Sequence, residues 1–272
     1  MKARELYQTV KNTLLNNKVD AADFEAAELL RAFADIDRKT LLSNPEKEVE
    51  HSKTLTALEK RVNGTPLQYL IGKWNFFGYD FLVGEGVLIP RPDTEILVEE
   101  TLKQIKGNMR VADLCCGSGC IAVTISKKTN AQVFALEKSE IAYQYLLKNI
   151  SLNNSTVTPI LSDVLTCGEL SNLDIIVSNP PYIKTDVIST LSSEVQKEPK
   201  MALDGGEDGL FFYREITKLW KDKLKKGGKI LFEIGFDQGK EVSEILKQNG
   251  FTDIQVIKDF SKNDRVVKAT LE

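Results

Sequence analysis

Beyond Gly107 the chain alternates between short apolar runs and longer stretches whose apolar residues recur at helical spacing. The predicted strands cover residues 110–114, 132–136, 157–161, 174–177 and 229–234. Strands that alternate with amphipathic helices are typical of a parallel α/β sheet covered on both faces. Two last runs, 251–258 and 265–271, follow one another without a helix, so we expect the final strand to be antiparallel.

The first part of the chain shows helical spacing throughout. Leu29, Leu30 and Phe33 fall on one helical face, and Gly64 marks a later break. We therefore expect a small helical domain over residues 1–73.

Residues 74–90 are rich in aromatic and β-branched residues and are interrupted by glycines, which predicts a β-hairpin joining two domains. Pro90-Arg91-Pro92 then fixes the chain direction before a helix over about 93–105. We place the second domain at residues 91–272.

The overall charge argues against a protein that binds long nucleic acids. The 272 residues carry a net charge of −3, with a pI near 5.5, so we expect no direct nucleic acid binding. The densest basic stretch, residues 221–229, holds five lysines beside one acid, and we interpret it as the solvated end of a helix before Gly227-Gly228.

The cysteine pattern fits neither a zinc site nor a disulfide framework, so we expect reduced thiols, no metal and a cytoplasmic protein. The four cysteines are Cys115, Cys116, Cys120 and Cys167. The single histidine, His51, lies in a charged stretch, which disfavours histidine-dependent catalysis. We find neither a signal peptide nor a run long enough to cross a bilayer.

A glycine-containing loop and an acid suggest a nucleoside site. Residues 113–119 join the first strand of the second domain to a helix, and Gly117 and Gly119 would let the backbone approach a ligand closely. Glu137, at the end of the next strand, could accept hydrogen bonds from both ribose hydroxyls. The loop alone could also be a plain strand-to-helix turn.

The ligand predicted for this loop contains ribose but no phosphate. No lysine follows to hold a pyrophosphate, and Asp113 would repel one, whereas S-adenosylmethionine fits. Asp163, after the third strand, could bind the adenine amino group, although it could equally be an acidic turn residue.

Asn179-Pro180-Pro181-Tyr182 follows an apolar run, where α/β enzymes place their chemistry. Because proline lacks an N–H, this backbone offers carbonyl acceptors, the Asn179 side chain adds another, and Tyr182 adds a flat wall. Such a site suits a substrate NH2 group. The alternative is a proline-rich turn that only ends a strand.

With these residues the chain resembles the class I S-adenosylmethionine methyltransferases, which have a Rossmann-like seven-stranded sheet with the last strand antiparallel. It is more specifically similar to the HemK/PrmC family. The motifs that carry this similarity are Phe77-Gly78, VLIPRPDTE at 87–95, NPPYI at 179–183, Glu198-Pro199, ALDGG at 202–206, DGL at 208–210, EIG at 233–235 and Gln238-Gly239.

The HemK/PrmC family methylates the glutamine side-chain amide in the GGQ motif of class I peptide-chain release factors. The resemblance implies the same function here, with S-adenosylmethionine as donor, S-adenosylhomocysteine as product and the helical domain as substrate-recognition module. The catalytic residues would be Asn179, Pro180 and Tyr182. The cofactor would contact Asp113, Cys115, Gly117, Gly119, Glu137, Asp163 and Asn179. The substrate would contact Asn179, Pro180, Pro181, Tyr182, Phe77 and Arg91.

Two of these assignments have structural alternatives: Arg91 could instead support the helix start, and Phe77 could pack between the domains. The sequence departs from the family where Cys115 replaces the usual glycine and Glu137 the commoner aspartate. We expect cofactor binding to survive both changes, and we expect a monomer.

Two other functions remain open. Asn-Pro-Pro-Tyr is shared with methyltransferases that act on amino groups of adenine or guanine in DNA or RNA, which the acidic charge balance disfavours. A non-catalytic module that holds a nucleoside is disfavoured by the presence of Asn179 beside a full cofactor loop.

Overall fold

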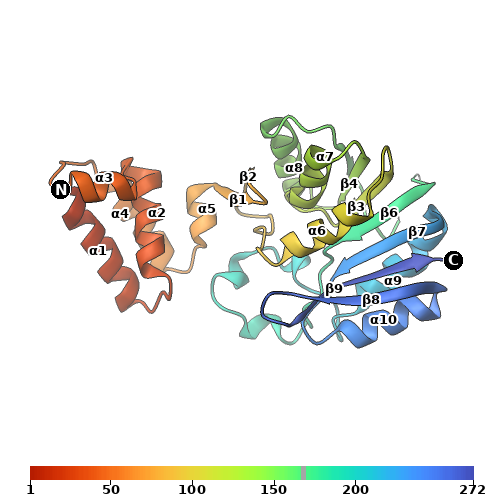
Figure 1. Ribbon diagram of the computed structural model, residues 1–272. Helices are drawn as coiled ribbons and strands as arrows, with labels where there is room; N and C mark the ends of the chain where they lie inside the picture. The colour runs from red at the N-terminus through yellow and green to blue at the C-terminus, as the bar shows by residue number, and fades with distance from the viewer. Residues whose placement is uncertain (167–169) are drawn as a thin grey trace. The chain divides into compact units, whose positions relative to one another are not determined.

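A seven-stranded sheet organises the larger part of the computed structural model, which describes residues 1–166 and 170–272 (Figure 1). Its strands lie in the order β5-β4-β3-β6-β7-β9-β8, and β9 runs antiparallel to the other six. Their bounds are β3 Arg110–Leu114, β4 Gln132–Glu137, β5 Thr158–Leu161, β6 Leu173–Ser178, β7 Leu224–Glu233, β8 Phe251–Lys258 and β9 Asp264–Leu271. The predicted doubly wound sheet with an antiparallel last strand is confirmed.

The strand order creates a switch point between β3 and β6. From β3 the chain moves outward to β4 and β5, then returns to β6 on the other side of β3 and continues to β7. At such a point the loops that follow the two central strands diverge, which opens a crevice at their carboxyl ends. The loop after β3 and the residues after β6 therefore flank one crevice.

Helices cover both faces of the sheet, as Figure 1 shows. One face packs against α6 Thr94–Gln104, α7 Cys120–Lys128 and α8 Glu140–Leu152. The other packs against α9 Phe211–Trp220 and α10 Gly239–Gln248. Because successive strand residues point to opposite faces, Val111 and Ala112 of β3 enter different clusters, which is why the central strands are apolar throughout.

The expected hairpin is present as β1 Lys73–Phe76 and β2 Tyr79–Leu82, which pair antiparallel. Phe77 and Gly78 connect them with φ angles of 52° and 80°. A two-residue turn with both residues at positive φ matches the twist of a hairpin. Short 3-10 segments lie between β6 and β7: η1 Ile188–Thr190, η2 Val195–Lys197, η3 Lys200–Ala202 and η4 Lys221–Lys223.

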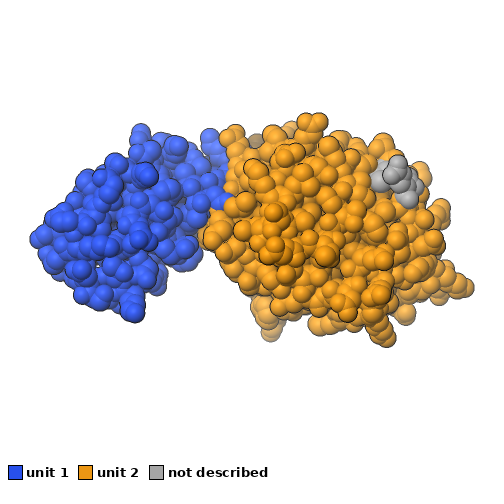
Figure 2. Space-filling model, turned by 90° about the horizontal axis from the view of Figure 1, so that it is seen from above, with its two compact units in different colours: residues 1–72, 192–197 blue, residues 73–191, 198–272 orange. Residues whose placement is uncertain are grey.

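The chain divides into two compact units, coloured separately in Figure 2. The first contains residues 1–72 and 192–197, and the second contains residues 73–191 and 198–272. The helices of the first unit are α1 Ala3–Asn16, α2 Ala22–Ala34, α3 Arg38–Ser43, α4 Ser52–Val62 and α5 Leu67–Ile71.

A buried ion pair stands within the first unit. The Arg61 side chain is 3% exposed and donates Nε to Glu25 Oε2 over 2.6 Å and Nη2 to Glu25 Oε1 over 2.9 Å. Its Nη2 also lies 2.6 Å from Glu194 Oε1, in the 192–197 segment that belongs to this unit. A guanidinium shared by two carboxylates satisfies charges that would be costly to bury alone.

The lysine-rich stretch differs from the expected helix end. Helix α9 ends at Trp220, and after η4 the chain is already in strand β7 from Leu224. Leu224 pairs with Leu173, the register shifts, and Lys225 Nζ lies 2.7 Å from Asp174 Oδ1. Pairing with β6 outweighs the polar composition here, because the strand start is anchored by one buried leucine and one ion pair.

Within the described residues, no helix is both long enough and apolar enough to cross a membrane.

Candidate active site

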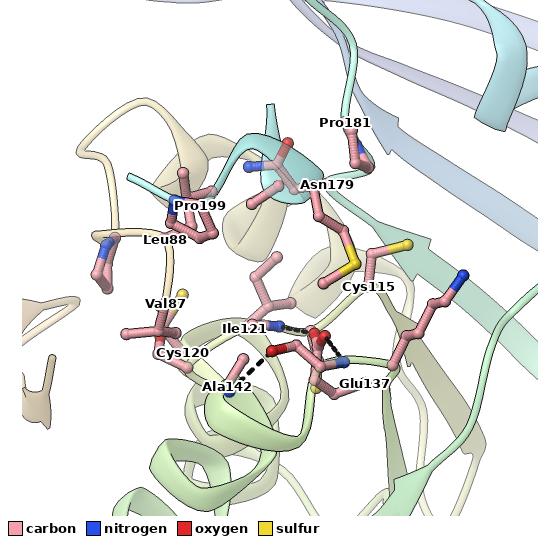
Figure 3. A pocket seen from close by; sticks show the side chains of 18 of the residues that line it. Val87, Leu88, Cys115, Cys120, Ile121, Glu137, Ala142, Asn179, Pro181 and Pro199 are labelled. Atoms are coloured by element: carbon pink, nitrogen blue, oxygen red, sulfur yellow. Dashed lines mark hydrogen bonds between the residues drawn. The ribbon is translucent and has the colours of Figure 1, made fainter. Parts of the chain in front are cut away.

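The loop after β3 is built around Glu137. Glu137 Oε2 accepts the Gly117 N–H over 2.8 Å and Oε1 accepts the Ser139 N–H over 2.7 Å. Burial raises the pKa of Glu137, while these backbone donors lower it. Each carboxylate oxygen keeps a lone pair, so the group that shapes the loop can still accept hydrogen bonds from a ligand. Figure 3 shows both bonds as dashed lines.

Glycine is required at the two loop positions, 117 and 119, for different structural reasons. Gly117 has φ 54°, and a Cβ there would meet nothing within 4 Å, so its backbone faces open space. Gly119 has φ 80°, and its Cβ would lie 2.4 Å from Leu146 Cδ1 of α8. Gly119 therefore permits the packing of α8 against the loop, whereas Gly117 leaves room for a ligand.

Asp113 lies beneath the loop and is fully buried. Its Oδ2 accepts the Ala122 N–H of α7 over 3.0 Å, and Oδ1 has no hydrogen-bond partner among the described residues. Burial raises the pKa of this carboxyl well above its usual value. Asp113 thus stabilises the start of α7 through Oδ2, and its Oδ1 remains without a hydrogen bond among the described residues.

Asp163 follows β5 and is held from two sides. Lys138 Nζ lies 2.8 Å from Oδ2, and the Leu165 N–H donates to Oδ1 over 2.9 Å. Burial alone would raise the pKa of Asp163, but Lys138 and the Leu165 N–H lower it overall. An ionised acceptor therefore stands at the end of β5.

These elements surround one cavity at the carboxyl edge of the sheet, seen in Figure 3. Much of its wall is apolar and includes Val87, Leu88, Ile121, Ala142, Pro181 and Pro199. The expected site residues on the wall are Arg91, Cys115, Gly117, Glu137, Asp163, Asn179 and Pro181. The expected site residues that lie off the described wall are Phe77, Asp113, Gly119, Pro180 and Tyr182. An apolar cavity with a few converging polar groups is the usual form of a small-molecule site.

Asn179 reaches the cavity from the end of β6. Ser178 Oγ donates to the Leu114 carbonyl over 2.6 Å, which ties the end of β6 to the end of β3. Asn179 Nδ2 donates to Thr94 Oγ1 over 3.4 Å. Since Nδ2 is used, Oδ1 is the amide atom left for a ligand.

The backbone after Asn179 is clamped by a distant segment. The Ile183 N–H donates to the Leu203 carbonyl over 2.9 Å, and the Gly205 N–H donates to the Ile183 carbonyl over 2.8 Å. Gln238 Nε2 donates to the Tyr182 carbonyl over 3.1 Å. The ALDGG and Gln238 motifs thus hold the Tyr182 backbone in place. Separately, burial raises the pKa of the Tyr182 hydroxyl to about 12.

We expect Gly205→Ala to lower turnover about tenfold, because a shift of the Asn179 loop misplaces the acceptor. The new Cβ would lie 2.7 Å from Tyr182 Cα and 2.9 Å from the Pro181 oxygen. Gly250→Ala is the control for a strained glycine substitution away from the cavity, since its φ of 85° disfavours alanine although a Cβ there meets nothing within 4 Å. Steady-state turnover measures the effect, and equal turnover of both variants would show that these backbone hydrogen bonds do not position Asn179.

Arg91 pairs with Glu198, whose side chain is 2% exposed. The second Glu198 oxygen accepts the Ile89 N–H over 3.0 Å. The pair fixes the segment that brings Pro199 onto the cavity wall. Arg91 therefore lines the cavity and also, through Glu198, holds the segment that carries Pro199 in place.

Phe77 lies in the hairpin turn, where its N–H donates to Glu95 Oε1 over 2.7 Å and its ring packs on the cluster beneath α6 and α7.

The described cysteines, Cys115, Cys116 and Cys120, are free thiols, and burial raises their pKa values. Cys167 lies outside the described residues. Cys115 has φ 60°, a region that glycine adopts more readily. The glycine that is usual in the family would therefore suit this backbone.

Cys115→Gly should raise the free energy of unfolding by up to about 1 kcal/mol. Relief of the left-handed conformation gains about 1 to 2 kcal/mol, and the greater freedom of glycine in the unfolded chain offsets about half of it. Thermal or urea unfolding gives the change. A loss of more than about 1 kcal/mol would mean that the thiol's packing outweighs the strain.

Sequence reasoning missed Thr94, Glu198 and Glu233. Thr94 and Glu198 occur inside family motifs but gave no chemical signal of their own, because their roles depend on side chains distant in sequence. Glu233 carried a signal, since it ends an apolar strand at the same sheet edge as Asn179.

The fold is shared with solved methyltransferases. A methyltransferase from Pyrococcus furiosus matches with a TM-score of 0.56 and 22% identity, over 72% of this chain and 90% of that one. A T. thermophilus 16S rRNA N2 G1207 methyltransferase, solved with AdoMet and guanosine, matches with a TM-score of 0.53 and 18% identity, over 74% of this chain and 50% of that one. The methyltransferase small domain family model matches residues 92–208. The sheet thus has the fold of these solved methyltransferases, and residues 92–208 match a methyltransferase domain.

The family follows from the remaining matches. The PrmC N-terminal domain model matches residues 5–72. A release factor glutamine methyltransferase of Clostridium botulinum is 43% identical over 92% of this chain and 93% of its own. Another, of Geobacter sulfurreducens, is 36% identical over 97% of this chain and 95% of its own. The chain belongs to the family of release factor glutamine methyltransferases.

Proposed function

We propose that the protein transfers a methyl group from S-adenosylmethionine to the side-chain amide nitrogen of the GGQ glutamine in class I peptide-chain release factors. The observation that carries this is that Asn179 shares one apolar cavity with Glu137 and the loop at Gly117. The relatives' names, release factor glutamine methyltransferase, support the choice of substrate.

The residues fit the donor. Glu137 retains lone pairs for two ribose hydroxyls, Gly117 leaves open space beside it, and Asp163 offers an ionised acceptor for an adenine amino group. Asp113 lies behind the wall and holds the start of α7 through the Ala122 N–H, so it would act on the donor through the loop. When bound, S-adenosylmethionine would supply the electrophilic methyl group. Cys115 and Gly119 complete the loop, the former on the cavity wall and the latter at its helix start.

The acceptor side must orient a weak nucleophile, because an amide lone pair is delocalised into its carbonyl. Asn179 Oδ1 and the Pro180 carbonyl would each accept one N–H of the glutamine amide, and both would stabilise the positive charge that develops on nitrogen. Pro181 and Tyr182 would help to enclose the amide plane. Orientation of this kind can supply about 7 to 11 kcal/mol of barrier reduction.

The remaining parts would recognise the substrate protein. We propose residues 1–73 as the recognition domain, 74–90 as its hairpin linker and 91–272 as the catalytic domain. The match of residues 5–72 to the PrmC N-terminal domain supports the first assignment. Phe77 and Arg91 would contribute near the substrate entrance, Arg91 through the wall that it shares with Glu198.

Mass spectrometry of a purified release factor after incubation with the protein and labelled S-adenosylmethionine tests this function. We expect one methyl group on the GGQ glutamine and none on a release factor whose GGQ glutamine is replaced by alanine. Matched DNA and RNA samples should gain no label. Label in nucleic acid alone would replace the proposal with an adenine or guanine methyltransferase.

A further inference from the structure

A buried carboxylate lies directly behind Asn179 and has no part in the chemistry proposed so far. Glu233 is the last residue of β7 and is 1% exposed. Ser178 of β6 pairs with Phe232 of β7, so the next residues on the two strands, Asn179 and Glu233, are neighbours at the carboxyl edge of the sheet. Glu233 Oε2 has no hydrogen-bond partner among the described residues. A carboxylate that is buried and incompletely paired is costly, so its presence calls for a functional reason.

Thr94 connects this carboxylate to the acceptor amide. Thr94 begins α6, is 2% exposed, and its Oγ1 accepts the Asn179 Nδ2 hydrogen over 3.4 Å. The side chains of Thr94 and Asn179 both interact with Glu233 so as to favour its ionised form. Since Thr94 accepts from Asn179, its own hydroxyl proton remains available to the Glu233 carboxylate.

We propose that Glu233, acting with Thr94, fixes the orientation of the Asn179 side-chain amide and is thus a positioning residue for methyl transfer. The inference rests on the proposed function, in which Asn179 Oδ1 accepts from the substrate. A negative carboxylate attracts Nδ2 and repels Oδ1, so the amide is held with Nδ2 inward and Oδ1 toward the cavity. A flipped amide would present N–H groups to the substrate N–H groups and could not accept from them.

The ionisation of Glu233 makes the arrangement sensitive to pH. The pKa of Glu233 is raised to about 7, chiefly by burial and also by Asp93, against the lowering effects of Thr94, Arg265 and Asn179. The opposing charge of Arg265 is shared, because its Nη2 lies 3.2 Å from both Asp93 Oδ2 and Asp259 Oδ2. The titratable groups that face Glu233 from other elements are Asp93, Cys120, Tyr182, Tyr213 and Arg265.

The sign of the pH effect follows from this. Above a pH of about 7 the carboxylate is charged and selects one amide orientation. As the pH falls through about 7 it gains a proton, and a neutral carboxyl can donate as well as accept, so the selection is lost. We therefore expect a decline of kcat on the acid side that belongs to Glu233.

Four variants of the full chain test the inference with a release factor as substrate. Thr94→Val should lower kcat about tenfold with unchanged S-adenosylmethionine affinity, and Thr94→Ser, which restores the hydroxyl, should recover most of the loss. Glu233→Gln should also lower kcat about tenfold and remove the decline near pH 7. Thr101→Val, on the same helix, is the control, because Thr101 Oγ1 donates to the Leu97 carbonyl of its own helix over 2.7 Å. Thermal unfolding and cofactor titration accompany each kinetic measurement.

Several outcomes would overturn the positioning role. One is a wild-type kcat in Thr94→Val, and another is an acid-side decline of kcat that persists unchanged in Glu233→Gln. The role would also be excluded if Thr101→Val lost as much kcat, or if each loss of kcat accompanied a fall in cofactor affinity or Tm. Failure of the proposed function is distinguishable, because in that case the wild-type protein itself adds no methyl group to the release factor.

Discussion

Asn179→Ala should lower kcat by about 2 to 4 kcal/mol of transition-state stabilisation, or roughly thirty- to a thousand-fold, while the cofactor still binds. The alanine removes the one side-chain acceptor that reaches the cavity from the end of β6. Glu137 and the loop at Gly117 are untouched, so the cofactor Kd should change little. Single-turnover methyl transfer, with calorimetric cofactor titration, separates these two quantities.

Asn108→Ala is the matched control for this experiment. Asn108 is exposed and lies just before β3, at the amino edge of the sheet and opposite the cavity. Its substitution should leave both kcat and cofactor Kd unchanged. If Asn179→Ala and Asn108→Ala gave equal turnover, Asn179 would have no role in the reaction.

Glu137→Ala should weaken cofactor binding about a hundredfold. The substitution removes the acceptor of the Gly117 and Ser139 N–H groups and the proposed acceptor of the ribose hydroxyls. A hydrogen bond to a charged group contributes about 1.5 to 3 kcal/mol, so a loss near 3 kcal/mol is expected. Isothermal titration with S-adenosylhomocysteine gives the change directly.

Two comparison variants sharpen this second experiment. Glu140→Ala removes an exposed carboxylate three residues further on, so it should leave the affinity unchanged. Glu137→Asp supplies the residue that is commoner in the family and should retain affinity within about tenfold. Equal affinity of Glu137→Ala and the wild type would place the ribose elsewhere.

The sheet could be predicted because each central strand is apolar on both faces and is bounded by polar residues. The start of β7 at Leu224 was harder to predict, because Lys225 and Lys226 are not typical of a strand. This start depends on contacts with Leu173 and Asp174. Likewise no sequence signal joins residues 192–197 to the first unit, since that grouping depends on Glu194 meeting a buried Arg61. Contacts between residues far apart in sequence leave no local periodicity.

The candidate site could be predicted where a residue follows a strand. Glu137, Asp163 and Asn179 were expected from this rule, and all lie on the cavity wall. Residues whose roles depend on tertiary partners could not be predicted. Thr94, for example, hydrogen-bonds with Asn179, which lies 85 residues away in the sequence. Gly119 was expected to let the backbone approach a ligand, whereas a Cβ there would lie 2.4 Å from Leu146 Cδ1, a packing reason that the sequence does not show.

A crystal structure of the protein with S-adenosylhomocysteine and a peptide containing the GGQ sequence tests the central claim most directly. The account predicts that the glutamine amide nitrogen lies within hydrogen-bond distance of Asn179 Oδ1 and faces the cofactor sulfur. A glutamine side chain bound outside the cavity lined by Glu137 and Asn179, or a cofactor sulfur turned away from Asn179, would contradict it.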